Sequence, residues 1–361
     1  MSKKEESELA VLPLTDPAPE ALQLTLFEGF FSEDGRLSRT LDIFDSVPKY
    51  IYSKTRRTED LKPITWTLEL HGQPAEVTLT PAIIQNGKGE AFAAFPGARE
   101  ELVELALRKL AVQQVAEFGL HVRRDSGERV IRVTFSLYQL RKQLQIIGHG
   151  FKIAEIKEAL QILSGAFLDI SWRPTNHRTR RARSPILDKP ISDFADDDEE
   201  GSRSFYSVNY HPLATQAILT LAYYPINYER VMKLKSPFGR WLAIRLSHNF
   251  RQARKTAAFE GMGYHLALST ILRESGMVRE ERLRDNVATV RKAVKEMVKQ
   301  RILHSMKPVE EKAQYAGTKG RPKMVDVVWT FFPSSEFATE IIEGNVSMSR
   351  LKSKRPADER K

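Results

Sequence analysis

The chain contains no cysteine among its 361 residues. This absence excludes disulfide frameworks, cysteine-based zinc sites and thiol nucleophiles, and it fits the reducing cytosol. No stretch approaches the roughly 18 uninterrupted apolar residues of a membrane-spanning helix, and the N-terminus lacks an apolar segment of signal-peptide length. We therefore expect a cytoplasmic protein with no membrane association.

Signatures of common enzymes are also missing. The eight histidines form no His-x-His pair, which argues against a nicking enzyme with a tyrosine nucleophile and a histidine-bound metal. No phosphate-binding G-x-x-x-x-G-K-[ST] run and no Ser-His-Asp signature is visible. The acidic run at 196–200 lacks the glycine and the spaced oxygen ligands of a calcium loop. We expect no enzymatic activity, no metal and no cofactor.

The charge that is present is mostly positive. Lys and Arg number 56 against 46 Asp and Glu, which gives a formal net charge of +10. Such an excess indicates a polyanionic partner, most often nucleic acid. The length and the 41% content of hydrophobic residues are typical of a chain with two globular domains.

Residues 1–40 are expected to form an acidic, largely disordered tail. Residues 1–35 carry two Lys against eight acids, a composition that opposes folding. Within this tail, a short run offers two leucines and a phenylalanine to an apolar cleft, while a glutamine amide fixes the register. An edge strand, or packing of the tail onto its own domain, is the alternative. The residues of the run are Gln23, Leu24, Leu26 and Phe27.

Residues 41–225 are predicted to form a first domain. Strand-like runs bounded by Gly and Pro extend to Ala94, and amphipathic patterns predict helices at 99–118 and 151–163. Between these two helices, Ser136 followed three residues later by Gln is a capping box that begins another helix, which ends near Ile147.

Two further strands are expected to pair as a wing around a charged loop at 173–203. With the preceding helices they give the element order of a winged helix, a helix-turn-helix variant. The arginine half of the loop is expected to lie against phosphates. The acidic half, 196–200, is either a solvated loop or a competitor of DNA for the arginines. The two strands are FLDISW and FYSVNY, and the arginines are Arg178, Arg180, Arg181 and Arg183.

Residues 226–345 are expected to repeat this architecture. Ser236 before Pro237 predicts the start of a helix that ends near Ala253. Its pattern lets Arg240, Arg251 and Arg254 face solvent. A short helix over HLALSTILRES and a long helix at 280–300 follow. RILHSM and MVDVVWTFF are expected to pair as a wing around a basic loop that contains Lys319 and Arg321. Residues 346–361 are expected to be a basic, disordered tail. The sequence thus predicts an α+β fold with two tandem winged-helix domains.

The long helix at 280–300 is the predicted DNA reader. An apolar stripe occupies one side at helical spacing, while the other side and its flanks are mainly basic. Arginine and lysine side chains suit guanine O6 and N7, a threonine methyl suits thymine, and a carboxylate can accept from cytosine N4. By contrast, the outward side of the helix at 151–163 carries Glu155, Glu158 and Gln161, which suits a protein contact or a weak reader. The predicted readers and phosphate contacts of the long helix are Arg284, Asp285, Thr289, Arg291, Lys292 and Lys295.

Three segments together resemble the TrfA-like initiators of plasmid replication, within the wider group that binds iterons, the short direct repeats of a plasmid origin. The resemblance covers residues from about 22 to 335 and depends mainly on the order of the segments. Two features depart from the family, namely the apparent insertion at 173–203 and the acidic residues Glu155 and Glu158. The segments are QLTLF at 23–27, VTFSLYQLRKQL with FKIAEIKEALQIL, and LKSPFGRWLAIRLSHNF.

The resemblance implies sequence-specific binding to direct repeats in double-stranded origin DNA and opening of an adjacent A·T-rich stretch. It also implies recruitment of the bacterial polymerase sliding clamp, through the QLTLF run, and of the host replicative helicase and initiator. A monomer–dimer equilibrium is compatible with this role. The alternatives are a winged-helix transcriptional repressor, which usually binds a palindrome as a dimer, and a nucleoid-type binder with little sequence preference. An initiator that also represses its own promoter would combine the first two functions.

Overall fold

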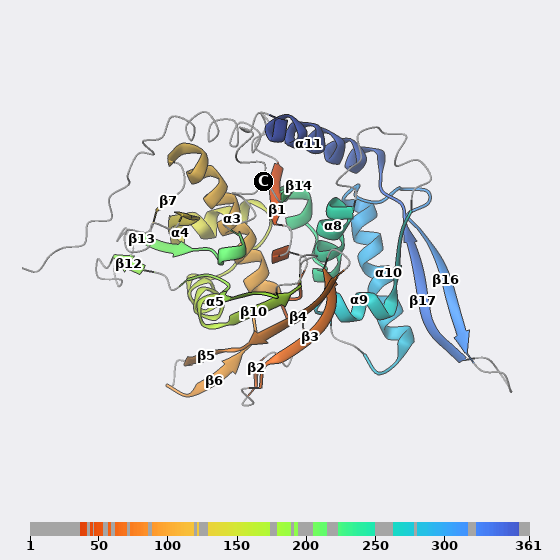
Figure 1. Ribbon diagram of the computed structural model, residues 1–361, viewed down its shortest axis with the longest axis horizontal. Helices are drawn as coiled ribbons and strands as arrows, with labels where there is room; N and C mark the ends of the chain where they lie inside the picture. The colour runs from red at the N-terminus through yellow and green to blue at the C-terminus, as the bar shows by residue number, and fades with distance from the viewer. Residues whose placement is uncertain are drawn as a thin grey trace, which may run out of the picture.

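The computed structural model describes residues 37–41, 44–45, 47–52, 57–58, 62–70, 73–85, 89–118, 121–122, 129–173, 179–188, 191–193, 205–214, 223–249, 263–277, 280–316 and 323–353. Helices and several small antiparallel sheets make up an α+β fold, as the sequence predicts. In Figure 1 the helices of the first half lie on the left, and those of the second half lie on the right. Among the described residues, no helix is long and apolar enough to cross a membrane.

The first half is built around three packed helices, α3 (Ala98–Phe118), α4 (Leu137–Ile146) and α5 (Ile153–Gly165). Their bounds agree with the predicted helices to within two residues. The hydroxyl of Ser136 accepts a hydrogen bond from the backbone N–H of Gln139 at 3.1 Å, so the predicted N-cap is confirmed. Gly148, at φ +90°, follows the end of α4, in a conformation that favours glycine.

A four-stranded antiparallel sheet packs beside these helices, in the order β11-β10-β4-β3. The strand-rich character of the segment up to Ala94 is confirmed by β3, β4 and the neighbouring hairpin of β5 and β6. One face of the sheet is buried, with Val77 and Leu79 opposite Ile170 and Leu168. The strands are β3 (Ile64–Leu70), β4 (Gln73–Thr80), β5 (Ala82–Gln85), β6 (Ala91–Ala94), β10 (Phe167–Trp172) and β11 (Arg180–Pro185).

The strand pairing predicted for the first wing is wrong. Strand β10, the predicted FLDISW strand, has β11 on one edge and β4 on the other. Both rows of its backbone hydrogen-bonding groups are therefore already used, so the FYSVNY strand has no edge of β10 to join. That strand, β13 (Phe205–Asn209), pairs instead with β9 (Arg132–Ser136) and β12 (Ile191–Asp193).

Short strands complete the first half. β1 (Leu37–Leu41) pairs with β14 (Tyr223–Asn227), so the last residues of the expected tail 1–40 lie in a strand. β2 (Arg57–Thr58) extends the hairpin of β5 and β6, and β7 (His121–Val122) pairs with β8 (Arg129–Val130).

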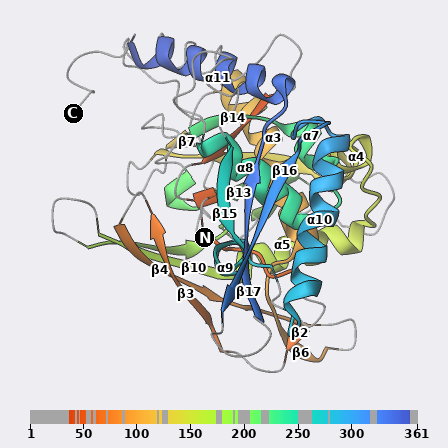
Figure 2. The same cartoon turned by 90° about the vertical axis from the view of Figure 1, so that its right-hand side faces the viewer.

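The second half begins with α7 (Tyr228–Met232) and α8 (Pro237–Asn249). The Ser236 hydroxyl accepts from the backbone N–H of Gly239 at 3.2 Å, which confirms the predicted start of α8. β15 (Tyr264–Ala267), α9 (Leu268–Glu274) and α10 (Leu283–Lys299) follow, then β16 (Val309–Ala316), β17 (Lys323–Phe331) and α11 (Ser335–Ser353). The three strands form one sheet in the order β15-β17-β16. Figure 2 shows the hairpin of β16 and β17 beside α10.

Three predictions for this half need correction. The partner of β17 is Val309–Ala316 and not RILHSM, of which only Leu303 makes an isolated bridge, to Pro333. The segment Tyr264–Ala267 is a strand, because it adds to the free edge of β17 before α9 begins. The C-terminal helix α11 continues to Ser353, into the region expected to be disordered from 346.

A buried ion pair joins the two halves. The side chain of Arg240 on α8 is 1% exposed, and its Nη2 donates to a carboxylate oxygen of Glu101 on α3 at 2.6 Å. Its Nη1 donates to the carbonyl oxygen of Leu234 at 2.7 Å. The prediction that Arg240 faces solvent is therefore wrong. A buried carboxylate requires a compensating partner, and a helical pattern within one domain gives no sign that this partner lies in the other.

A second buried set of charges lies next to this pair. Asp45 accepts from Lys49 Nζ at 2.7 Å and from two nitrogens of Arg108 on α3 at 2.6 and 3.0 Å. Burial alone would raise the pKa of Asp45, but the cations of Arg108 and Lys49 hold it well below its usual range. The segment around Asp45 is therefore fixed to the first half by paired charges in the interior.

The same segment also contacts the second half. The backbone N–H of Tyr52 donates to the carbonyl oxygen of Gly276 at 3.4 Å. Gly276 follows α9 at φ +67°, and a Cβ added there would lie 2.2 Å from the carbonyl oxygen of Tyr50. Only glycine permits both this backbone conformation and this approach. Residues 47–52 therefore pass between the two halves and contact both.

Candidate nucleic-acid interface

The helix α10 has one buried and one exposed side, as predicted. Val287, Val290, Val294 and Met297 are buried against the second core, and Leu283 is partly buried there. The remaining positions form an exposed face that is rich in Lys and Arg. Its residues are Arg284, Asp285, Ala288, Thr289, Arg291, Lys292, Lys295 and Lys299.

The start of α10 is fixed by a buried asparagine. Asn286 is 2% exposed. Its side-chain oxygen accepts from the N–H of Glu280 at 2.9 Å, and its amide nitrogen donates to the carbonyl oxygens of Glu280 and Arg282 at 2.9 and 3.3 Å. These bonds close the preceding turn onto the helix. The position of the first exposed residues of α10 is therefore set by its own sequence.

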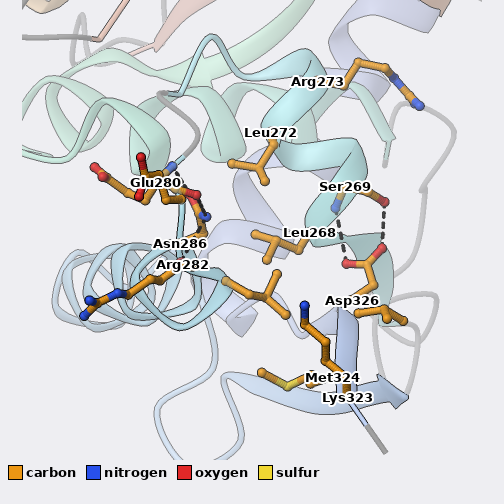
Figure 3. Close-up of a pocket in the computed structure, with 13 residues that line it drawn as sticks. Leu268, Ser269, Leu272, Arg273, Glu280, Arg282, Asn286, Lys323, Met324 and Asp326 are labelled. Carbon is orange, nitrogen blue, oxygen red and sulfur yellow. Dashed lines mark hydrogen bonds between the residues drawn. The ribbon is translucent and has the colours of Figure 1, made fainter. Parts of the chain in front are cut away.

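A groove of about 630 Å³ lies between α9, the start of α10 and β17. Figure 3 shows the Lys323 side chain pointing into it, with Arg282 on the side of α10. On the side of α9, the Ser269 hydroxyl donates to the Asp326 carboxylate at 2.7 Å, and the Ser269 N–H donates to it at 3.3 Å. Cations and carboxylates both line the groove, so its lining alone does not favour an anion.

The predicted reader Arg291 is engaged in an ion pair. Its Nη2 lies 2.6 Å from Glu311 Oε2 on β16, and its Nε donates to the two oxygens of Glu311 at 3.0 and 3.1 Å. The guanidinium of Arg291 holds the pKa of Glu311 below its usual range, although partial burial opposes this. Glu311 was not among the predicted site residues, because the strand that carries it was expected to be a loop.

The other predicted readers on α10 remain on the exposed face. The Arg284 Nε lies 3.6 Å from the Asp285 carboxylate, and both side chains are more than half exposed. The Thr289 hydroxyl donates to the carbonyl oxygen of Asp285 at 3.1 Å, so its methyl group is the part left for an apolar contact. Lys292 and Lys295 are exposed.

The arginines of the first half lie on an exposed strand at the sheet edge. Arg180, Arg181 and Arg183 belong to β11, and all three are exposed. Arg181 pairs with Asp169 on β10, and the Arg183 guanidinium lies 5.9 Å from the centre of the Phe167 ring. Arg181 and Arg183 therefore lie on the outer face of the four-stranded sheet, whereas Arg180, opposite Trp172, lies on the face of Ala182 at the end of the strand.

The helix α5 offers little surface for reading DNA. An apolar cluster of Ala82, Ile84 and Ala94 from the hairpin of β5 and β6 packs against Ile162 and Ala166. A Cβ added at Gly165 would lie 2.9 Å from the Cβ of Ala82, so the hairpin approaches the helix closely. Only Ala154 and Gln161 are exposed in α5.

The acids that made α5 look unlike a reader have structural roles. Glu158 pairs with Arg99 on α3 at 2.6 Å, and Glu155 accepts from the N–H of Lys152 at 2.7 Å. The first contact ties α5 to α3, and the second satisfies a backbone donor at the start of the helix.

Several predicted site residues lie outside the described residues. They are Arg178 and the acidic run 196–200 in the charged loop, Lys319 and Arg321 between β16 and β17, and Gln23, Leu24, Leu26 and Phe27 in the N-terminal tail. Within the described parts of the chain, no group of three or more His, Asp or Glu side chains is placed to hold a metal ion.

Comparisons with known proteins give solved structures of low similarity, among them two of RctB. Domains 2 and 3 of RctB match with a TM-score of 0.44 and 12% identity, over 80% of this chain and 95% of the other. A second structure of RctB domains 2-3 matches with a TM-score of 0.44 and 11% identity, over 82% and 99%. Identities and TM-scores this low give no support to a particular function. No protein-family model matches the chain, and no curated protein matches it in sequence.

Proposed function

We propose that this chain is a sequence-specific DNA-binding protein built from two tandem winged-helix domains, 41–225 and 226–345. The second domain is the main reader. The observation that carries this proposal is the exposed, basic face of α10, which lies beside the hairpin of β16 and β17. The order α8, β15, α9, α10, β16, β17 and the sheet order β15-β17-β16 fit a winged helix.

The chemistry of α10 suits a helix that enters the major groove. Lysines and arginines around such a helix neutralise phosphates and release counterions, which supplies affinity with little sequence information. Sequence is then read by side chains that reach base edges. Arg284 and Lys292 have the donors for guanine, and Thr289 has the methyl group for thymine. In the first domain, the arginines of β11 suit phosphate contacts, while α5 is too covered to act as a second groove reader.

We further propose that the bound DNA is a plasmid replication origin with direct repeats. The support is the resemblance of the sequence to TrfA-like initiators, carried by the run at 23–27 and by the order of the three segments. In this role the protein acts in the bacterial cytoplasm without catalysis. It helps open the origin, and it recruits the sliding clamp, the helicase and the host initiator.

A footprint on DNA from the protein's own replicon, at two salt concentrations, tests this function. Protection of evenly spaced direct repeats that survives the higher salt is the expected result. Protection of one palindrome over a promoter would instead favour a transcriptional repressor. Diffuse protection that disappears with salt would reduce the function to nonspecific binding.

Single substitutions on α10 test the reading helix. Lys292→Ala or Arg284→Ala should weaken specific binding by about 1–3 kcal/mol where the residue contacts a base. An equal loss on unrelated DNA would make that residue a phosphate contact. Lys142→Ala is a matched control, because Lys142 is an exposed lysine on α4 in the first half and its removal should change specific binding little.

The proposed clamp contact is tested separately from DNA binding. Leu26→Ala combined with Phe27→Ala removes the two largest apolar side chains at the end of the run. Binding to the purified sliding clamp should be lost, while the footprint on DNA stays unchanged. Clamp binding that persists would refute the role of the tail.

A further inference from the structure

We propose that Arg291 and Glu311 form a latch that sets the angle between the hairpin of β16 and β17 and the helix α10. Arg291 is then a positioning residue of the DNA-binding site, and not a contact to a base. The inference rests on the proposed function of α10, but the latch itself is a property of the free protein.

The hairpin needs such a contact because most of it lies beyond the three-stranded part of its sheet. β15 pairs only with the last four residues of β17, Val328 to Phe331. From Val327 back to Lys323, β17 pairs only with β16 among the described strands. A two-stranded ribbon with no third strand twists easily. Its direction depends on the contacts at the point where it leaves the sheet.

Glu311 lies at that point. It is opposite Trp329, within the three-stranded part of the sheet. The two-stranded part of the hairpin begins two residues later, where Ala313 pairs with Val327. Trp329 is fully buried, so the backbone of β16 beside it is held firmly. Both oxygens of the Glu311 carboxylate accept hydrogen bonds from the Arg291 guanidinium, and the shortest joins Nη2 to Oε2 at 2.6 Å. Paired hydrogen bonds of this kind fix orientation as well as distance.

A second contact holds the other strand of the hairpin. Asp326 on β17 accepts from the hydroxyl and the N–H of Ser269 on α9. It also accepts from its neighbour Val327 N–H at 2.7 Å. The hairpin is therefore tied to α10 through β16 and to α9 through β17. A hairpin tied on both sides presents its outer part at one angle to the helix α10.

The ion pair is too exposed to add much stability. The side chains of Arg291 and Glu311 are 59% and 25% exposed, and pairs of this kind contribute little to folding. The contribution of the pair is therefore to the orientation of the hairpin and not to the stability of the fold. A base contact by Arg291 would also require its guanidinium to give up the Glu311 carboxylate, whereas Lys292 and Arg284 require no such exchange with β16.

The distance between hairpin and helix tests the latch in the free protein. Because the chain has no cysteine, Gln314→Cys on β16 and Lys299→Cys on α10 allow two spin labels to be placed at exposed sites. We expect a narrow distance distribution in the parent protein and a broad or shifted one after Glu311→Gln. The swap of Arg291→Glu with Glu311→Arg should restore the narrow distribution. A distribution unchanged by Glu311→Gln would overturn the latch, whatever the protein binds.

DNA binding then separates positioning from base contact. Glu311→Gln removes an acid and leaves every cation in place, so a base-reading or phosphate-binding Arg291 predicts unchanged or tighter binding. The latch predicts weaker specific binding, by about tenfold for a coupled pair of neighbours, and recovery in the swapped protein. Specific binding that is as weak in the swap as in Arg291→Glu alone would refute the positioning role. If the unsubstituted protein gives no footprint on DNA, the proposed function is refuted, while the distance measurement still tests the latch.

Discussion

Replacing Arg240 with methionine tests the buried contact between the two halves. Methionine keeps much of the volume of arginine but leaves the Glu101 carboxylate, which is 5% exposed, without its guanidinium. Removing one member of a buried ion pair costs about 3–5 kcal/mol, because the remaining charge is left unpaired in the interior. That is a large part of the roughly 5–15 kcal/mol that stabilises a typical domain.

Urea unfolding followed by tryptophan fluorescence measures this cost, since Trp241 follows Arg240 in α8. With a urea m-value of about 3 kcal/mol/M, the midpoint should fall by about 1–1.7 M. The double variant Arg240→Met with Glu101→Leu should recover most of the loss, because an apolar pair of similar volume often replaces a buried ion pair without cost. Arg284→Ala breaks an exposed contact and should change stability by less than about 0.5 kcal/mol. A loss below about 1 kcal/mol for Arg240→Met would show that the pair is open to water.

Three other predictions concern stability. Gly276→Ala should cost at least about 2 kcal/mol in urea unfolding, because its methyl meets the Tyr50 carbonyl at a positive φ. Gly150→Ala, whose methyl meets open space, is the control. Ser136→Ala should cost about 1 kcal/mol by the same assay, and Ser136→Asp should keep the cap. Burial lowers the pKa of His211 from 6.5 to about 4. The folded state favours the neutral ring, so this contribution to the free energy of unfolding is fully present above pH 6.5. It should decrease by about 3 kcal/mol as the pH falls to 4, because the unfolded chain takes up the proton first.

The outcome that would contradict each of these is specific. Equal stabilities of the alanine variants at 276 and 150 would mean that the approach of residues 47–52 is loose. A Ser136→Asp variant as unstable as Ser136→Ala would remove the capping explanation. For His211, the slope of stability against pH between 6.5 and 4 should flatten in His211→Gln. An unchanged slope would assign the pH dependence to other groups.

The sequence predicted what depends on local chemistry. Ser136 and Ser236 mark helix starts through short-range hydrogen bonds, and the apolar stripe of α10 reports its own buried side, so both were found without the fold. The exposed face of α10 was also found in this way, because it consists of helix positions outside the apolar stripe. The α+β class followed from these local patterns.

What the sequence could not predict depends on partners far along the chain. β10 was expected to pair with β13, but its two edges are taken by β11 and β4, and β4 begins 94 residues before β10. Arg240 was placed in solvent because its partner Glu101 lies in the other half. Glu311 was missed because the segment that forms β16 was expected to be a loop, and only the pairing of β16 with β17 decides which of its side chains face α10.

The buried pair of Glu101 and Arg240 also affects the order in which parts of the chain can fold during translation. The two residues are 139 positions apart, and at about 5 to 20 residues per second a ribosome needs about 7 to 28 s to go from one to the other. During that interval α3 holds a carboxylate that its final environment would not tolerate alone. The nascent first half must keep this side of α3 hydrated and unpacked until α8 emerges. A boundary drawn near residue 225 therefore separates two halves of the sequence, but it does not separate two units that mature independently.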